Sequence, residues 1–188
     1  MKQNKYKIDL KQIMDECSLN GSGADEGKVL YNALVSHIDS NPQHNVFYLS
    51  INESFFDASF AREGIVKVAL HYRMKKGLCL IDLDEEDTLE NILGPVAKLE
   101  QPIPYYLGEK YNLVSYKKIG SPSKTNLPIF EFLLSRGLTT ATEVADQFDL
   151  KLSNASTKLK ALFEEGFLLR EEQKSTSGGL EFFYFAIK

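Results

Sequence analysis

The chain has 188 residues, of which 43% are hydrophobic, so it can bury the core of one ordinary domain or of two small ones. Its formal charge of −4 excludes a protein that coats nucleic acid or anionic membranes through net charge, although local basic patches remain compatible with it. No apolar run reaches membrane-spanning length, and the start of the chain lacks a signal-peptide pattern, so we expect a cytoplasmic protein without membrane contact. Cys17 and Cys79 lack the spacing of a zinc site and are expected to be reduced thiols.

The first half of the chain alternates strand patterns with helix patterns. Residues 46–51 form a near-continuous apolar run, which is typical of a strand covered on both faces in a mostly parallel sheet. A helix is expected to follow, capped by Asp57 and stopped near Gly77, before a second apolar strand at 78–81. Strand, crossover helix and strand make a βαβ unit, which predicts an α/β layer structure.

The remaining elements of this part extend the same layer. The other predicted elements are a strand at 6–10, a helix at 25–39, a helix at 87–99 interrupted by Gly94 and Pro95, and closing strands at 103–107 and 111–116. Residues 120–126 are rich in turn formers and are expected to form a linker. The sequence therefore predicts two domains, spanning residues 1–120 and 121–188.

Signals for three helices and a hairpin follow one another in the second predicted domain. The signals are Asn126 and Pro128 at the start of the first helix with Gly137 at its end, a capping box from Thr140 to Glu143, Ser153 as the cap of the third helix, and a hairpin turn through residues 177–179. In the third helix, the apolar face is predicted to comprise Ala155, Leu159, Leu162 and Phe163, and the opposite stripe Ser153, Thr157, Lys160 and Glu164.

This segment resembles the winged helix-turn-helix regulators of the MarR and ArsR groups, on the pattern Leu159-Lys-Ala-Leu162 and Gly166-Phe-Leu168 before a hairpin. The resemblance implies an α+β fold whose third helix enters the major groove of double-stranded DNA while the wing meets the backbone or minor groove. The DNA contacts that it implies are Asn154, Ser156, Thr157, Lys158 and Lys160 in the helix and Lys174, Ser175 and Thr176 at the wing tip. A homodimer is expected, because two copies would double the phosphate contacts.

The charge of the second predicted domain leaves a second hypothesis about its function open. Residues 121–188 hold eight Lys or Arg and nine Asp or Glu, a net of −1, whereas DNA binding normally needs several cations facing phosphates. A winged helix that contacts protein instead of DNA is the alternative, since a fold does not determine a function.

The strand and helix at residues 46–72, with Ser59-Phe60-Ala61 at the helix start, resemble a bacterial group of STAS-like domains. In the anti-sigma-factor antagonists of the wider family, a serine at this position is phosphorylated. Ser59 matches that serine, while Ala58 and Phe60 replace the first serine and the glycine of the family motif. The resemblance implies dimerisation, sensing or binding of a protein partner, with Ser59 as a switch. Because of these departures from the motif, the simpler interpretation that Asp57 and Ser59 only cap the helix is favoured.

Two further patterns carry weaker predictions. Residues 22–29 have a phosphate-loop-like spacing, but a serine and a valine stand where that loop needs glycine and a hydroxyl, so a simple turn is favoured. The acidic run at residues 82–87 follows a strand and could hold magnesium, yet is more typical of a solvated helix start. We therefore expect no catalytic residue, metal or cofactor, and a prokaryotic, non-catalytic regulator that binds DNA or, alternatively, a protein-interaction adaptor.

Overall fold

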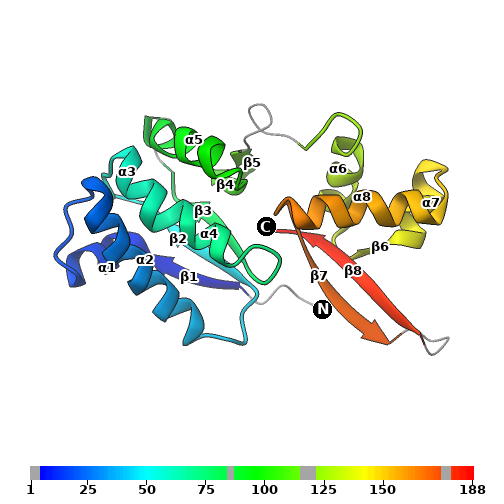
Figure 1. Ribbon diagram of the computed structural model, residues 1–188, viewed down its shortest axis with the longest axis horizontal. Coiled ribbons are helices and arrows are strands. Elements are labelled where there is room, and N and C mark those ends of the chain that lie inside the picture. Colours follow the sequence, from blue (N-terminus) through cyan, green and yellow to red (C-terminus); the bar gives the residue numbers. More distant parts are fainter. Residues whose placement is uncertain (1–4, 84–86, 115–121, 175–178) are drawn as a thin grey trace.

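The computed structural model describes residues 5–83, 87–114, 122–174 and 179–188, and shows a mixed α/β protein with a mostly parallel sheet (Figure 1). We refer to residues 5–114 as the N-terminal part and to residues 122–188 as the C-terminal part. In chain order the N-terminal part contains β1 (Lys5–Asp9), α1 (Leu10–Glu16), α2 (Gly23–Asp39), β2 (Val46–Ser50), α3 (Ala58–Ala61), the π-helix η1 (Arg62–Val66), α4 (Lys67–His71), β3 (Gly77–Ile81), α5 (Asp87–Leu99), β4 (Ile103–Leu107) and β5 (Lys110–Val114).

The five strands of the N-terminal part lie in the sheet in their sequence order, β1-β2-β3-β4-β5. The first four run parallel and β5 returns antiparallel to β4. All five strands were predicted from the sequence to within a few residues, and the mostly parallel sheet is confirmed.

The helices pack on one face of this sheet, which we call the helical face (Figure 1). Phe47 and Leu49 of β2 are fully buried there, in a cluster with residues of α1, α2, α3, α4 and α5. Their neighbours in β2, Val46 and Tyr48, belong to a different cluster, because successive side chains of a strand point to opposite faces.

Two glycines allow α2 to approach the helix that follows β2. A Cβ atom at Gly64 would lie 2.6 Å from the Cδ2 atom of Leu30, and one at Gly27 would lie 2.8 Å from the carbonyl oxygen of Phe60. Only hydrogen fits at either position, so both glycines are required for the contact between α2 and η1.

Two expectations for the N-terminal part were wrong. The segment α5 runs without interruption through Pro95, because Ile92 and Val96, on either side of that residue, are both fully buried. The helix after β2 ends at His71, so Gly77 does not stop it and instead opens β3. A Cβ atom at Gly77 would lie 2.5 Å from the Cγ2 atom of Ile187, so this glycine is needed for packing against the end of the chain.

The C-terminal part contains α6 (Leu127–Arg136), β6 (Thr139–Thr140), α7 (Ala141–Phe148), α8 (Leu152–Glu164), β7 (Leu168–Lys174) and β8 (Leu180–Ala186). Its three strands form an antiparallel sheet in the order β6-β8-β7. The three helices, the hairpin and the Thr140–Glu143 capping box were all predicted, and the box is complete in both directions. The predicted cap at Ser153 is wrong: α8 begins at Leu152 after Lys151, and Ser153 lies inside the helix, where its carbonyl accepts the Thr157 hydroxyl.

The base of the β7–β8 hairpin covers the second face of the five-stranded sheet, which we call the hairpin face. In Figure 1 the end of β8 reaches the middle of the molecule, while the other end of the hairpin points away from the first sheet. The shared cluster comprises Val46, Cys79, Leu169, Phe185 and Ile187, with Tyr48, Tyr106 and Leu138 packed against it. This apolar cluster joins the two parts, and Tyr111 of β5 also packs against the core of the C-terminal part.

The described helices include none that is both long and apolar enough to cross a membrane. The predicted boundary at residue 120 falls in residues 115–121, which lie outside the described residues.

Candidate functional site

The outer face of α8 carries most of the predicted DNA contacts. Asn154, Ser156, Thr157 and Lys160 are exposed, and the helical spacing predicted this for Thr157 and Lys160. On its inner side α8 buries the four predicted apolar residues in the core of the C-terminal part, namely Ala155, Leu159, Leu162 and Phe163. The core thus fixes α8 in place while its polar stripe stays open to a partner.

Lys158 differs from the other predicted contacts. Its side-chain ammonium donates to the carbonyl oxygen of Thr125 at 3.3 Å and to Oδ1 of Asn126 at 3.2 Å, and the residue is half-buried. These bonds brace the turn before α6 against α8. Lys158 therefore holds the C-terminal part together, while Lys160, whose ammonium lies 3.7 Å from the carboxylate of Glu164, keeps an exposed charge.

On the hairpin, Lys174 is exposed at the end of β7, and the predicted contacts Ser175 and Thr176 lie outside the described residues. Arg170 of the wing was not among the predicted DNA contacts, and its guanidinium lies 4.5 Å from the ring centroid of Phe163 and 4.2 Å from that of Phe182. A cation stacked between two rings is attracted to both faces, so Arg170 helps to set the hairpin against α8.

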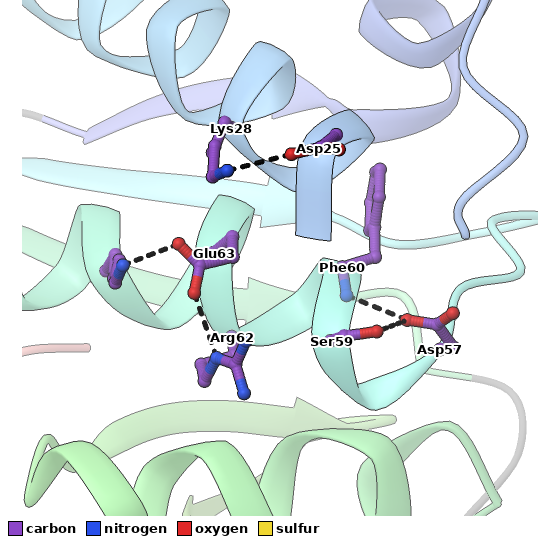
Figure 2. Close-up of polar contacts among 8 residues, drawn as sticks. Asp25, Lys28, Asp57, Ser59, Phe60, Arg62 and Glu63 are labelled. Carbon is purple, nitrogen blue, oxygen red and sulfur yellow. Dashed lines mark hydrogen bonds and ion pairs between the residues drawn. The ribbon is translucent and has the colours of Figure 1, made fainter. Parts of the chain in front are cut away.

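A second polar centre lies at the start of α3, where Asp57 accepts hydrogen bonds from Ser59 and Phe60 (Figure 2) and also from the start of α2. Its carboxylate accepts the N–H of Phe60 at 2.8 Å, the Ser59 hydroxyl at 2.7 Å, the N–H of Gly23 at 2.8 Å and the Ser22 hydroxyl at 3.2 Å. The N–H of Phe60, followed by the other three donors, lowers the pKa of Asp57 well below its ordinary value. The expected cap at Asp57 is confirmed, and it also ties α2 to α3.

Ser59 is half-buried, and its hydroxyl points to Asp57 (Figure 2). It lines an open groove of about 530 Å³ together with Arg62, Gly94 and Lys98. Ser59 and Asp57 thus share this groove with two cations, of which Arg62 is also paired with Glu63.

Glu63, in η1, is a charged residue that is only 7% exposed. Its carboxylate accepts the ammonium of Lys67 at 2.5 Å and Nε of Arg62 at 2.9 Å (Figure 2). These contacts, with that of Lys67 the strongest, lower the pKa of Glu63. A π-turn adds a residue to the helical repeat and so rotates the helix faces, which α-helical spacing could not predict.

The first two amide groups of the phosphate-loop-like stretch are occupied by carboxylates. Glu26 accepts the N–H of Ser22 at 3.2 Å, and Asp57 accepts the N–H of Gly23 at 2.8 Å. Two acidic side chains thus stand where a phosphate would have to bind, so the geometry favours the simple turn.

The acidic run after β3 is described only in part, because residues 84–86 lie outside the described residues. Asp82 accepts the ammonium of Lys7 at 2.8 Å and the hydroxyl of Ser50 at 2.6 Å. Within the described part of the chain, no three His, Cys, Asp or Glu residues gather closely enough to hold a metal ion.

No protein-family model matches the chain, and no curated protein is similar enough to it to count as a match. The two family resemblances therefore depend on the residues and the geometry of this chain alone.

Proposed function

We propose that the protein is a non-catalytic regulator that binds double-stranded DNA as a homodimer, with a STAS-like N-terminal part for dimerisation, sensing or partner binding and a winged helix at its C-terminus. The observation that carries this proposal is the placement of α8. Its inner face is buried in the core, whereas Asn154, Ser156, Thr157 and Lys160 are exposed on its outer side.

The arrangement around α8 supports a winged helix. Three helices precede an antiparallel hairpin, and α7 leads into α8 through a short turn in which Asp149 adopts a left-handed conformation. In proteins of this architecture the helix before the hairpin lies in the major groove and the hairpin tip contacts the backbone. Lys160 and Lys174 are exposed cations on those two elements.

The net charge of −1 over residues 121–188 makes a single C-terminal part a weak ligand for DNA. A dimer would present two α8 helices and two hairpins, so that each copy adds its cations to the same site. We therefore expect DNA binding that depends strongly on salt and on protein concentration.

Fluorescence anisotropy with the double-stranded DNA upstream of the protein's own gene, at about 50 and 200 mM salt, tests this proposal. Lys160→Glu should weaken binding several-fold and reduce the salt dependence by about one phosphate contact per copy. Lys98→Glu is the matched control, because it makes the same charge change at an exposed position of α5. Lys158→Glu is unsuitable, since it would remove the brace to Thr125 and Asn126. Binding that is absent, or equal for both variants, would reject DNA contact by α8.

The second candidate is a protein-interaction adaptor switched by phosphorylation of Ser59. The distance of 2.7 Å between the Ser59 hydroxyl and Asp57 favours it, because a phosphate there would meet an ionised carboxylate and weaken the link between α2 and α3. Arg62 and Lys98, in the same groove, would then attract the phosphate outward.

Peptide mass spectrometry on the protein purified from its own cells tests the switch. A phosphorylated Ser59 combined with no salt-sensitive DNA binding would favour the adaptor. An unmodified Ser59 in every growth phase, combined with DNA binding that Lys160→Glu weakens, would exclude it.

A further inference from the structure

Phe55 is the most exposed large apolar side chain among the described residues, with 82% of its surface open to solvent. It lies in the loop between β2 and α3, next to Phe56, which is buried and stacks on Phe60 at 6.2 Å. An isolated exposed aromatic ring gains nothing for the fold, because its apolar area remains in water.

The backbone next to Phe55 is held in place by contacts with other segments. A Cβ atom at Gly21 would lie only 2.0 Å from the carbonyl oxygen of Phe55, so the two segments approach closely at this glycine. The carbonyl oxygen of Gly21 accepts the N–H of Asp57 at 2.8 Å. The carbonyl of Phe56 accepts the side-chain amide of Asn91 at 3.0 Å. A ring presented by a pinned loop loses little conformational entropy on binding, as expected of a binding hot spot.

Beside Phe55 the surface is hollowed and acidic. A depression of about 180 Å³ is lined by Phe55, Ile51, Leu83 and Thr88, among others. It continues, through Asn52, Glu53 and Asp82, into a groove of about 460 Å³ at the carboxyl ends of β1, β2 and β3. The charged residues that line this groove are Lys7, Asp9, Lys11, Asp15, Glu16, Glu53 and Asp82, five acids against two bases.

Both lysines of the groove are already paired within the chain. The ammonium of Lys7 lies 2.8 Å from Asp82, and that of Lys11 lies 2.5 Å from Asp15. Glu53 is exposed and makes no hydrogen bond or ion pair with another described residue. The groove therefore presents a negative surface next to an apolar ring.

We propose that Phe55 and this groove form a docking surface for a protein partner that presents lysine or arginine side chains beside an apolar residue. The apolar residue would pack against Phe55 in the depression, and the cations would face Glu53 and the other acids of the groove. A second copy of this chain is a poor occupant, because two acidic surfaces would face each other. The inference rests on the proposed partner-binding role of the N-terminal part and is independent of DNA contact by α8.

Fluorescence anisotropy with a labelled peptide of alternating leucine and lysine tests the surface, with a leucine–glutamate peptide of the same pattern as the charge control. The leucine–lysine peptide should bind in a salt-sensitive manner, and Phe55→Ala should weaken it at least about tenfold, as at a hot spot. Glu53→Lys should weaken binding and reduce its salt dependence. Leu180→Ser, at an apolar side chain of the hairpin that is 68% exposed, is the matched control and should bind as the unaltered protein does.

Three results would overturn the proposal: no binding of the leucine–lysine peptide, equal binding by Phe55→Ala, or equally tight binding of the leucine–glutamate peptide. Self-association in sedimentation that Phe55→Ala abolishes would also overturn it, since the occupant would then be a second copy. The urea midpoint of Phe55→Ala should stay close to that of the unaltered protein, because Phe55 is 82% exposed. DNA binding by this variant should also be unchanged, which separates failure of this surface from failure of the DNA-binding proposal.

Discussion

The two faces of the five-stranded sheet are buried in different ways. The helical face is covered by helices that lie between consecutive strands of the same sheet, so its contacts join segments close in sequence. The hairpin face is covered by residues from the end of the chain: Ile187 contacts Gly77, and Glu171 accepts the side-chain amide of Asn45 at 3.5 Å.

This difference bears on how the two parts depend on each other. Without the hairpin, the fully buried side chains of Val46 and Cys79 would be exposed to water. The C-terminal part is therefore an integral cover of the N-terminal sheet, and a change on the hairpin face has a direct physical route to the hairpin that is proposed to meet DNA.

The largest expected effect is on the helical face. Phe47→Ala removes a fully buried ring from the larger cluster and should lower the free energy of unfolding by about 3–5 kcal/mol, measured by urea denaturation. Phe185→Ala, on the hairpin face, should lower the free energy of unfolding by an amount at the lower end of that range, because the cluster around Phe185 is smaller and has half-buried neighbours. A larger loss for Phe185→Ala would show that the hairpin face is the dominant core.

Shortening a buried side chain on the hairpin face should open that face locally. Ile187→Ala should cost about 2–3 kcal/mol and speed the reaction of Cys79 with a thiol reagent, measured in a Cys17→Ser background. In the unaltered protein this reaction should be slow, because burial raises the pKa of the Cys79 thiol to about 12. Ile92→Ala, on the helical face, is the control. If it speeds the reaction of Cys79 as much as Ile187→Ala does, the whole protein opens and the two faces do not unfold separately.

The start of α3 contributes a smaller, pH-dependent amount. Asp57→Ala should lower the free energy of unfolding by about 1–2 kcal/mol near neutral pH, because a helix cap and the link to Gly23 are lost. The pKa of Asp57 is lowered in the folded protein, so its contribution is present above about pH 4 and is lost as the pH falls through the folded value. Urea midpoints measured from neutral to acidic pH should therefore converge for the two proteins; a constant difference would contradict the role of the charge.

The smallest effect is expected at the free end of the hairpin. Leu180 is 68% exposed, so Leu180→Ser should change the free energy of unfolding by less than about 0.5 kcal/mol in the same urea measurement. A larger loss would mean that the hairpin is buried along its whole length and not only at its base.

Much of the secondary structure could be predicted because its signals are local. The Thr140–Glu143 capping box and the exposed stripe of α8 follow from hydrogen bonds and periodicity within one helix, and both are confirmed. The misplaced cap at Ser153 shows the limit of such signals, since a helix can begin one residue earlier without any side-chain cap. The burial of Glu63 escaped prediction because a π-turn breaks the α-helical period.

The sequence by itself determined that β2 would be covered on both faces, because its apolar run has no polar side to leave in water. Only the tertiary structure decided what covers the second face, since contacts between residues far apart in the sequence, such as Asn45 and Glu171, leave no periodic trace in either segment. The same reason applies to Lys158, whose residue type and position predicted a DNA contact but whose ammonium braces the turn before α6. Local hydrogen bonding and alternation can be read along the chain, whereas the partner of a buried face or a long side chain is settled by packing in space.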